Sequence, residues 1–158
     1  MNNKLKAYKK FVKNELIPLE PLLLNHQYDE LYSELDQKRN QIKKLNLWAP
    51  YLPKKDGGQG MKFLEFVSVS EILGRSLLGH YAFNCQAPDI GNIELILRLG
   101  DDKQKTNFLE PLMSGEIRSC VGMVEPERPG SNPSWIETSA VKDNGYYIIN
   151  GRKWFTSS

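Results

Sequence analysis

The chain has 158 residues, and its 21 Lys and Arg against 19 Asp and Glu give a net charge of +2. A chain of this length buries about two thirds of its unfolded surface, enough for one core or for one domain plus part of another. The balanced charge argues against nucleic acid as a partner, and no apolar run reaches the ~20 residues of a membrane span. We therefore expect an intracellular protein without a membrane span.

The two cysteines, Cys85 and Cys120, stand in apolar surroundings and lack the close spacing of a metal or redox pair. We expect both to be buried free thiols in a reducing compartment. The two histidines, His26 and His80, show no metal-ligand spacing with them, so no metal site is predicted.

Five helices are expected before any strand. The first ends before Pro18, because proline lacks an amide donor and clashes with the preceding helical turn. The second ends before a loop that contains Pro50, Pro53 and several glycines. The apolar stripes are Leu5, Tyr8, Val12 and Leu16 in the first helix and Leu31, Leu35, Ile42 and Leu45 in the second.

The third helix is predicted over 63–78. Pro88 opens a fourth helix that ends at Gly100, and Asp101 or Asp102 caps a fifth. The buried face expected for the third helix consists of Phe63, Phe66, Val67, Ser70, Gly74 and Leu77, and the fifth carries Phe108, Leu109 and Leu112.

From Gly115 the pattern becomes extended. A buried strand is predicted over 117–124, and three short strands over 136–141, 146–149 and 152–156. Asn-Gly pairs at 144–145 and 150–151 separate the last three and are typical of tight hairpin turns. The predicted fold class is α+β: an N-terminal all-α bundle over 1–116, then over 117–158 the first antiparallel strands of an incomplete, β-barrel-like middle domain.

The end of the predicted strand 117–124 favours binding of a planar heterocycle. Pro126 cannot continue a strand ladder, so main-chain groups there are left free to form hydrogen bonds. Trp154 and Phe155 are neighbours on a predicted strand and would point to opposite faces, one into the core and one toward a ring. From the pattern alone, two core aromatic residues are the simpler interpretation.

Several motifs together resemble acyl-CoA dehydrogenases, over nearly all 158 residues. Val124-Glu125-Pro126 and then Gly130-Ser131 stand where the family has Thr-Glu-Pro and then Gly-Ser. Asn150-Gly151-Arg152-Lys153 stands where it has Asn-Gly-x-Lys before an aromatic residue and a Ser or Thr. The run LPKKDGGQG over 52–60 is similar to the family's Pro-x-x-x-Gly-Gly-x-Gly loop.

The resemblance implies FAD as the cofactor and identifies the residues beside it. The implied cofactor-binding residues are Val121, Gly122, Met123, Val124, Gly130, Ser131, Phe155, Thr156 and Ser157. Ser131 would also approach the acyl-CoA substrate. Val124 replaces the usual Thr and so removes one side-chain hydrogen bond to the flavin. No catalytic residue is assigned, because the family's base comes from a C-terminal helical domain or a nearby alternative helix.

The function that the resemblance implies is α,β-dehydrogenation of an acyl-CoA, with the hydride passing to FAD. We expect this chain to be the N-terminal part of such an enzyme, because the exposed edge of the last predicted strand is normally covered. We expect it to be inactive alone, because the base and half of the flavin envelope are missing. An electron-transfer acceptor, homo-oligomerisation at full length, and a cytoplasmic or, in a eukaryote, mitochondrial location are also implied. An acyl-CoA oxidase or flavin monooxygenase of the same fold, and a non-catalytic partner-binding helical module, remain open alternatives.

Overall fold

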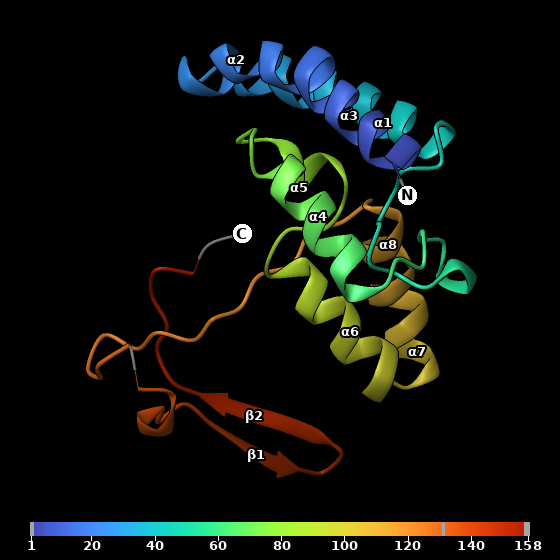
Figure 1. The fold of residues 1–158 in the computed structure, drawn as a ribbon. Helices are drawn as coiled ribbons and strands as arrows, with labels where there is room; N and C mark the ends of the chain where they lie inside the picture. The colour runs from blue at the N-terminus through green and yellow to red at the C-terminus, as the bar shows by residue number, and fades with distance from the viewer. Residues whose placement is uncertain (1, 131, 157–158) are drawn as a thin grey trace. The chain divides into compact units, whose positions relative to one another are not determined.

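The computed structural model describes residues 2–130 and 132–156 (Figure 1). The chain forms two compact units, Met1–Ile117 and Arg118–Ser158. The first is helical, and the second contains an antiparallel pair of strands. The predicted α+β class, with helices first and antiparallel strands second, is confirmed. The assignment of 1–116 and 117–158 as two functional domains stays a prediction.

The first unit follows the expected helix order, with additional breaks. Its helices are α1 Asn2–Phe11, α2 Glu20–Leu24, α3 Tyr28–Lys44, α4 Phe63–Leu73, α5 Gly79–Ala82, α6 Asp89–Leu99, α7 Asp102–Gln104 and α8 Glu110–Ser114. A π-helical turn, Val12–Leu16, follows α1, and a 3-10 turn, Ile17–Leu19, contains Pro18 and leads into α2, so the helix does not stop before Pro18 as predicted. Another π-helical turn, Lys105–Leu109, joins α7 to α8. No described helix is long and apolar enough to cross a membrane.

Most of the predicted helix ends are confirmed. Pro88 immediately precedes α6, and Gly100 follows it. The Asp101 carboxylate accepts the amide of Gln104, whose side chain in turn accepts the amide of Asp101. This reciprocal cap satisfies amides that the first helical turn leaves unpaired.

The predicted third helix differs most from the structure. The helix α4 ends at Leu73, and its buried residues are Val69 and Leu73. Phe63, Val67 and Leu77, which we expected to face the core, are exposed by 77%, 46% and 65%. Because the sequence FLEFVSVSEIL has apolar residues on both sides of the helix, its pattern does not determine which side is buried.

The helical unit has one apolar core. Phe83 is fully buried, and its ring centroid lies 5.2 Å from that of Tyr8 and 5.7 Å from that of Phe11. The Tyr8 hydroxyl donates to the Leu47 carbonyl over 2.9 Å, so this buried polar group has a partner. Cys85 is buried as expected, and burial raises the pKa of its thiol to about 12.

The second unit contains the hairpin of β1 Ser139–Asp143 and β2 Tyr146–Asn150 (Figure 1). Asp143 pairs with Tyr146 across the turn, where Asn144 and Gly145 have φ values of 46° and 88°. This confirms the predicted Asn-Gly turn, which needs positive φ at both central positions. Every residue of both strands is exposed.

Two of the predicted strands are wrong. Residues 117–124 are not a strand in the structure, none of them is buried, and Cys120 is an exposed thiol. Residues 152–156 are not a strand either, so the second Asn-Gly pair makes no hairpin within 132–156. A strand needs a partner for its amides, and the hydrophobic pattern of one segment does not supply that partner.

Candidate functional site

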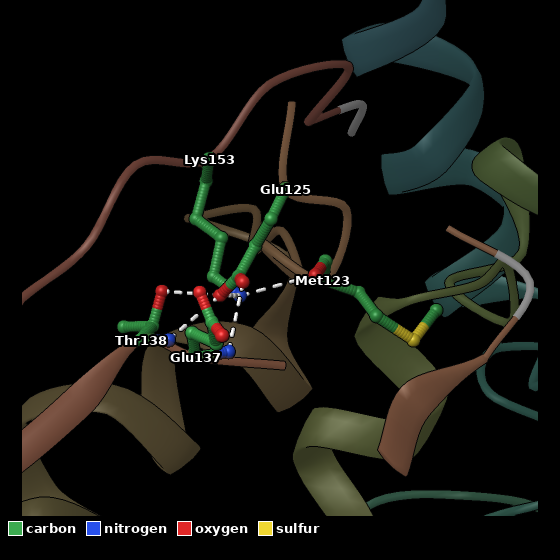
Figure 2. Close-up of polar contacts among 5 residues, drawn as sticks. All are labelled: Met123, Glu125, Glu137, Thr138 and Lys153. Atoms are coloured by element: carbon green, nitrogen blue, oxygen red, sulfur yellow. Dashed lines mark hydrogen bonds and ion pairs between the residues drawn. The ribbon is translucent and has the colours of Figure 1, made fainter. Parts of the chain in front are cut away.

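Glu125 is the centre of the polar cluster in Figure 2, and it directly follows 121–124, one of the segments predicted to bind the cofactor. Its carboxylate accepts the amide of Glu137 over 2.8 Å, and the amide and hydroxyl of Thr138 over 2.8 and 2.6 Å. Lys153 Nζ donates to it over 2.9 Å. Glu125 is only 5% exposed, so these bonds compensate for removing a charge from water.

Lys153 connects this cluster to the main chain before it. Its ammonium also donates to the Met123 carbonyl over 3.0 Å, and the next amide, that of Trp154, donates to the Val124 carbonyl over 3.2 Å. Three consecutive residues, 123–125, are thus held through their carbonyl or carboxylate oxygens by residues 153–154. The segment is fixed without being a strand.

The bonds to the carboxylate keep Glu125 ionised. The Thr138 hydroxyl, then Lys153, then the Thr138 amide lower the pKa of Glu125 to about 2. Hydrogen bonds to a carboxylate favour its charged form, and a nearby cation does the same. At neutral pH the pair of Glu125 and Lys153 is therefore a carboxylate and an ammonium with no net charge.

The predicted segment 121–124 leaves its amide donors available. Val121, Gly122 and Met123 are exposed, and within the described residues their amides donate to no other group. A planar heterocycle with acceptor atoms on its edge fits such a row of donors. Free main-chain groups were expected at the end of a strand, beside Pro126. The free amides lie earlier instead, at 121–123, because no strand forms there.

The structure brings several other predicted residues to this segment. A Cβ placed on Gly122 would lie 3.7 Å from the hydroxyl oxygen of Thr156, and one on Gly130 would lie 2.9 Å from Val124 Cγ1. Gly122 and Thr156 are therefore neighbours, and so are Val124 and Gly130. Ser131 and Ser157 lie outside the described residues.

Trp154 and Phe155 do not point to opposite faces as predicted. Phe155 has a φ of 49°, which breaks the alternation of an extended strand, and the two ring centroids lie 5.0 Å apart. Phe155 is 81% exposed and Trp154 is 46% exposed, so neither is a core residue. An exposed aromatic ring suits contact with a flat ligand.

The arrangement is an open surface and not an enclosed site. The small cavity beside Met123, Glu125 and Gly130 has a volume of about 10 Å³, which is room for at most one water molecule. No group of three or more His, Cys, Asp and Glu side chains suited to a metal ion occurs in 2–130 or 132–156. The donors and the exposed ring fit one wall of a flavin site, and they do not fit a metal centre.

The sequence did not identify Glu125, Thr138 and Lys153 as a unit. Glu125 and Lys153 belong to the motifs that carry the resemblance, but no role was assigned to either. A Glu before a proline and a Lys after Asn-Gly were the available signals. Nothing in the sequence indicates Thr138, because its bond to Glu125 joins residues 13 positions apart.

Comparisons with known proteins agree with one another. Residues 4–116 match the family profile described as "Acyl-CoA dehydrogenase, N-terminal domain". The mouse protein "Acyl-CoA dehydrogenase family member 10" is 38% identical over 156 residues, which cover 93% of this chain and 15% of that protein. Human "Acyl-CoA dehydrogenase family member 11" is 37% identical over 123 residues, which cover 78% of this chain and 15% of that protein.

A solved structure extends the similarity to both units. A Mycobacterium abscessus protein described as an acyl-CoA dehydrogenase superposes with a TM-score of 0.89 at 33% identity. The match covers 98% of this chain and 41% of that protein. The chain thus spans less than half the length of that protein and about a seventh of the mouse relative.

Proposed function

This chain belongs to the acyl-CoA dehydrogenase family, and we propose that its residues 121–124, 130 and 155–156 form one wall of an FAD site. The observation that carries the proposal is the row of amides at Val121, Gly122 and Met123, which donate to no group in 2–130 or 132–156 and precede Glu125, the partner of Lys153. The family motifs fall on the same residues. Ser131 and Ser157 enter the proposal through the resemblance alone.

The proposed reaction is α,β-dehydrogenation of an acyl-CoA thioester, for which bound FAD supplies the hydride acceptor. The amides of 121–123 would donate hydrogen bonds to bound FAD, and Phe155 would contact it. The Thr156 hydroxyl beside Gly122 adds a further donor. The side chains of this wall thus bind and orient the flavin, and none of them is assigned as the base.

Several finer parts of the proposal accompany the activity. The acyl-CoA substrate, an electron-transfer acceptor, a homo-oligomer and a cytoplasmic or mitochondrial location are all proposed from the family. The 158-residue chain by itself is proposed to be inactive, because its flavin wall is open to solvent. An acyl-CoA oxidase or flavin monooxygenase is the second candidate, since those enzymes use the same fold.

The product of the native gene provides the direct test. It should purify with FAD, and its visible absorbance should bleach anaerobically when an acyl-CoA is added. Oxygen consumption during turnover would favour the oxidase or monooxygenase. The 158-residue chain alone should purify colourless, and tightly bound flavin in that chain would contradict the open-wall argument.

Phe155→Ala tests the wall itself. It should shift the flavin absorbance and lower FAD occupancy, whereas Trp135→Ala, which removes another half-exposed ring of the same unit, should do neither. An unchanged spectrum in Phe155→Ala would remove that residue from the site.

A further inference from the structure

The ion pair between Glu125 and Lys153 differs from the other ion pairs of the second unit. Their side chains are 6% and 24% exposed, whereas those of Arg152 and Glu127 are 70% and 56% exposed. Exposed pairs are screened by water and contribute little, but a shielded pair acts strongly on its neighbours. Two adjacent residues, Arg152 and Lys153, therefore offer a matched comparison.

The hydrogen bonds of Lys153 give the pair a specific place. Its ammonium lies between the Glu125 carboxylate at 2.9 Å and the Met123 carbonyl at 3.0 Å, as Figure 2 shows. The segment with free amides, 121–123, therefore ends at the Met123 carbonyl, which accepts a hydrogen bond from Lys153. Removal of the lysine would release that carbonyl and leave the buried carboxylate charge without its cation.

We propose that Glu125 and Lys153 are positioning residues that hold residues 121–124 against 154–156 and keep the charge beneath this wall balanced. The inference rests on the proposed FAD site. The pair, having no net charge, would favour neither the reduced nor the oxidised form of a flavin bound at this wall. Thr138 contributes by fixing the carboxylate through its amide and hydroxyl.

The reduction potential of bound FAD, measured on the product of the native gene, tests the charge balance. Glu125→Gln leaves the ammonium uncompensated, so it should raise the potential, because a nearby positive charge favours the more negative reduced flavin. Lys153→Met leaves the carboxylate uncompensated and should lower the potential. The double variant should return close to the wild-type value.

Control variants separate charge from loosening. Lys153→Arg keeps the charge and should leave the potential near that of the wild type, and Arg152→Met and Glu127→Gln should leave it unchanged. The proposed charge balance would be wrong if the reduction potential shifted in the same direction in Glu125→Gln and Lys153→Met. It would also be wrong if the control variants shifted the potential equally. If the pair had only a structural role, both Glu125→Gln and Lys153→Met would lower FAD occupancy, but they would not shift the reduction potential in opposite directions.

Hydrogen exchange tests the positioning without FAD. In the 158-residue chain, Lys153→Met should speed exchange of the Trp154 amide at least tenfold, while Arg152→Met should not; equal rates in both would overturn the positioning role. Absence of FAD from the wild-type gene product would instead reject the proposed function, and this exchange experiment would still decide whether Lys153 holds the segment.

Discussion

The two units of this chain are stabilised by opposite kinds of interaction. The buried residues of the first are mainly apolar and include Tyr8, Phe83 and Ile93, which are fully buried. Among the described residues of 118–156, Glu125 is the one buried residue, and it is charged. The stability of the helical unit should therefore fall most when buried side-chain volume is removed. The stability of the second unit should fall most when a charge or a hydrogen bond is removed.

The difference also separates stability from the proposed function. The first unit buries its side chains around one core, while the second leaves amides and an aromatic ring in solvent and orders them through a polar cluster. A binding wall needs free donors, and a hydrophobic core would have covered them.

The largest effect is expected from Phe83→Ala in the helical unit. Removal of a fully buried ring packed against Tyr8 and Phe11 should lower the free energy of unfolding by about 3–5 kcal/mol. Urea unfolding followed by helical circular dichroism measures it. Phe63→Ala, at a side chain 77% exposed, is the matched control and should cost less than ~0.5 kcal/mol. Similar losses in both variants would mean that the core is placed wrongly.

Lys153→Met should change the pH dependence of the second unit's stability, by changing the pKa of Glu125, and not the packing of a core. Ionised Glu125 stabilises the second unit fully above the usual pKa of 4.5, and that contribution is lost as pH falls from 4.5 through about 2. Without Lys153 the pKa of Glu125 should rise toward its usual value, though Thr138 still holds it down. Carboxyl carbon shifts in a nuclear magnetic resonance titration report the midpoint.

Arg152→Met is the control for that titration, since its partner Glu127 is exposed. It should leave the Glu125 midpoint where it is in the wild type. If Glu125 of the wild type titrated with a midpoint near 4.5, the cluster would not stabilise its charged form. The proposed difference between the two units would then be wrong.

Sequence reasoning succeeded where the structure is local. Helix periodicity and the cap at Asp101 need only near neighbours, and they were predicted. The helix end expected before Pro18 was not found, because a 3-10 turn accommodates the proline. The buried side of α4 was not, because both of its sides are apolar and the partner helices decide between them. The hairpin at 144–145 was found because its turn is encoded in two adjacent residues.

The candidate site was predicted in part. The segments 121–124 and 155–156 came from motifs, and in the structure Gly122 and Thr156 are neighbours. Their conformations as strands were wrong, since strands depend on distant partners. The bond from Thr138 to Glu125 was missed for the same reason, and the flavin contacts themselves stay a prediction.

Gly151→Ala should perturb the polar cluster more than a glycine change in the hairpin turn. A Cβ at Gly151 would overlap the side chain of Thr138, which must then move away from Glu125, at a cost of roughly 1–3 kcal/mol. Faster exchange of the Thr138 amide would report it. Gly145→Ala has free space but a φ of 88°, so it should cost about 1–2 kcal/mol and spare that amide.

The smallest effect is expected from Val124→Thr, which supplies the hydroxyl that the Thr-Glu-Pro motif implies at this position. Val124 is half-buried against Gly130, and its carbonyl already holds the Trp154 amide. The added hydroxyl should strengthen FAD binding by about 0.5–1.5 kcal/mol, which is tenfold or so at most. Titration of FAD into the apoprotein of the native gene product gives the dissociation constant, and Val121→Thr, at an exposed side chain, is the control. A loss of affinity by orders of magnitude would mean that Val124 serves only to pack against Gly130. The alignment of 121–124 with the family's flavin-facing segment would then be wrong, although the polar cluster around Glu125 would be unaffected.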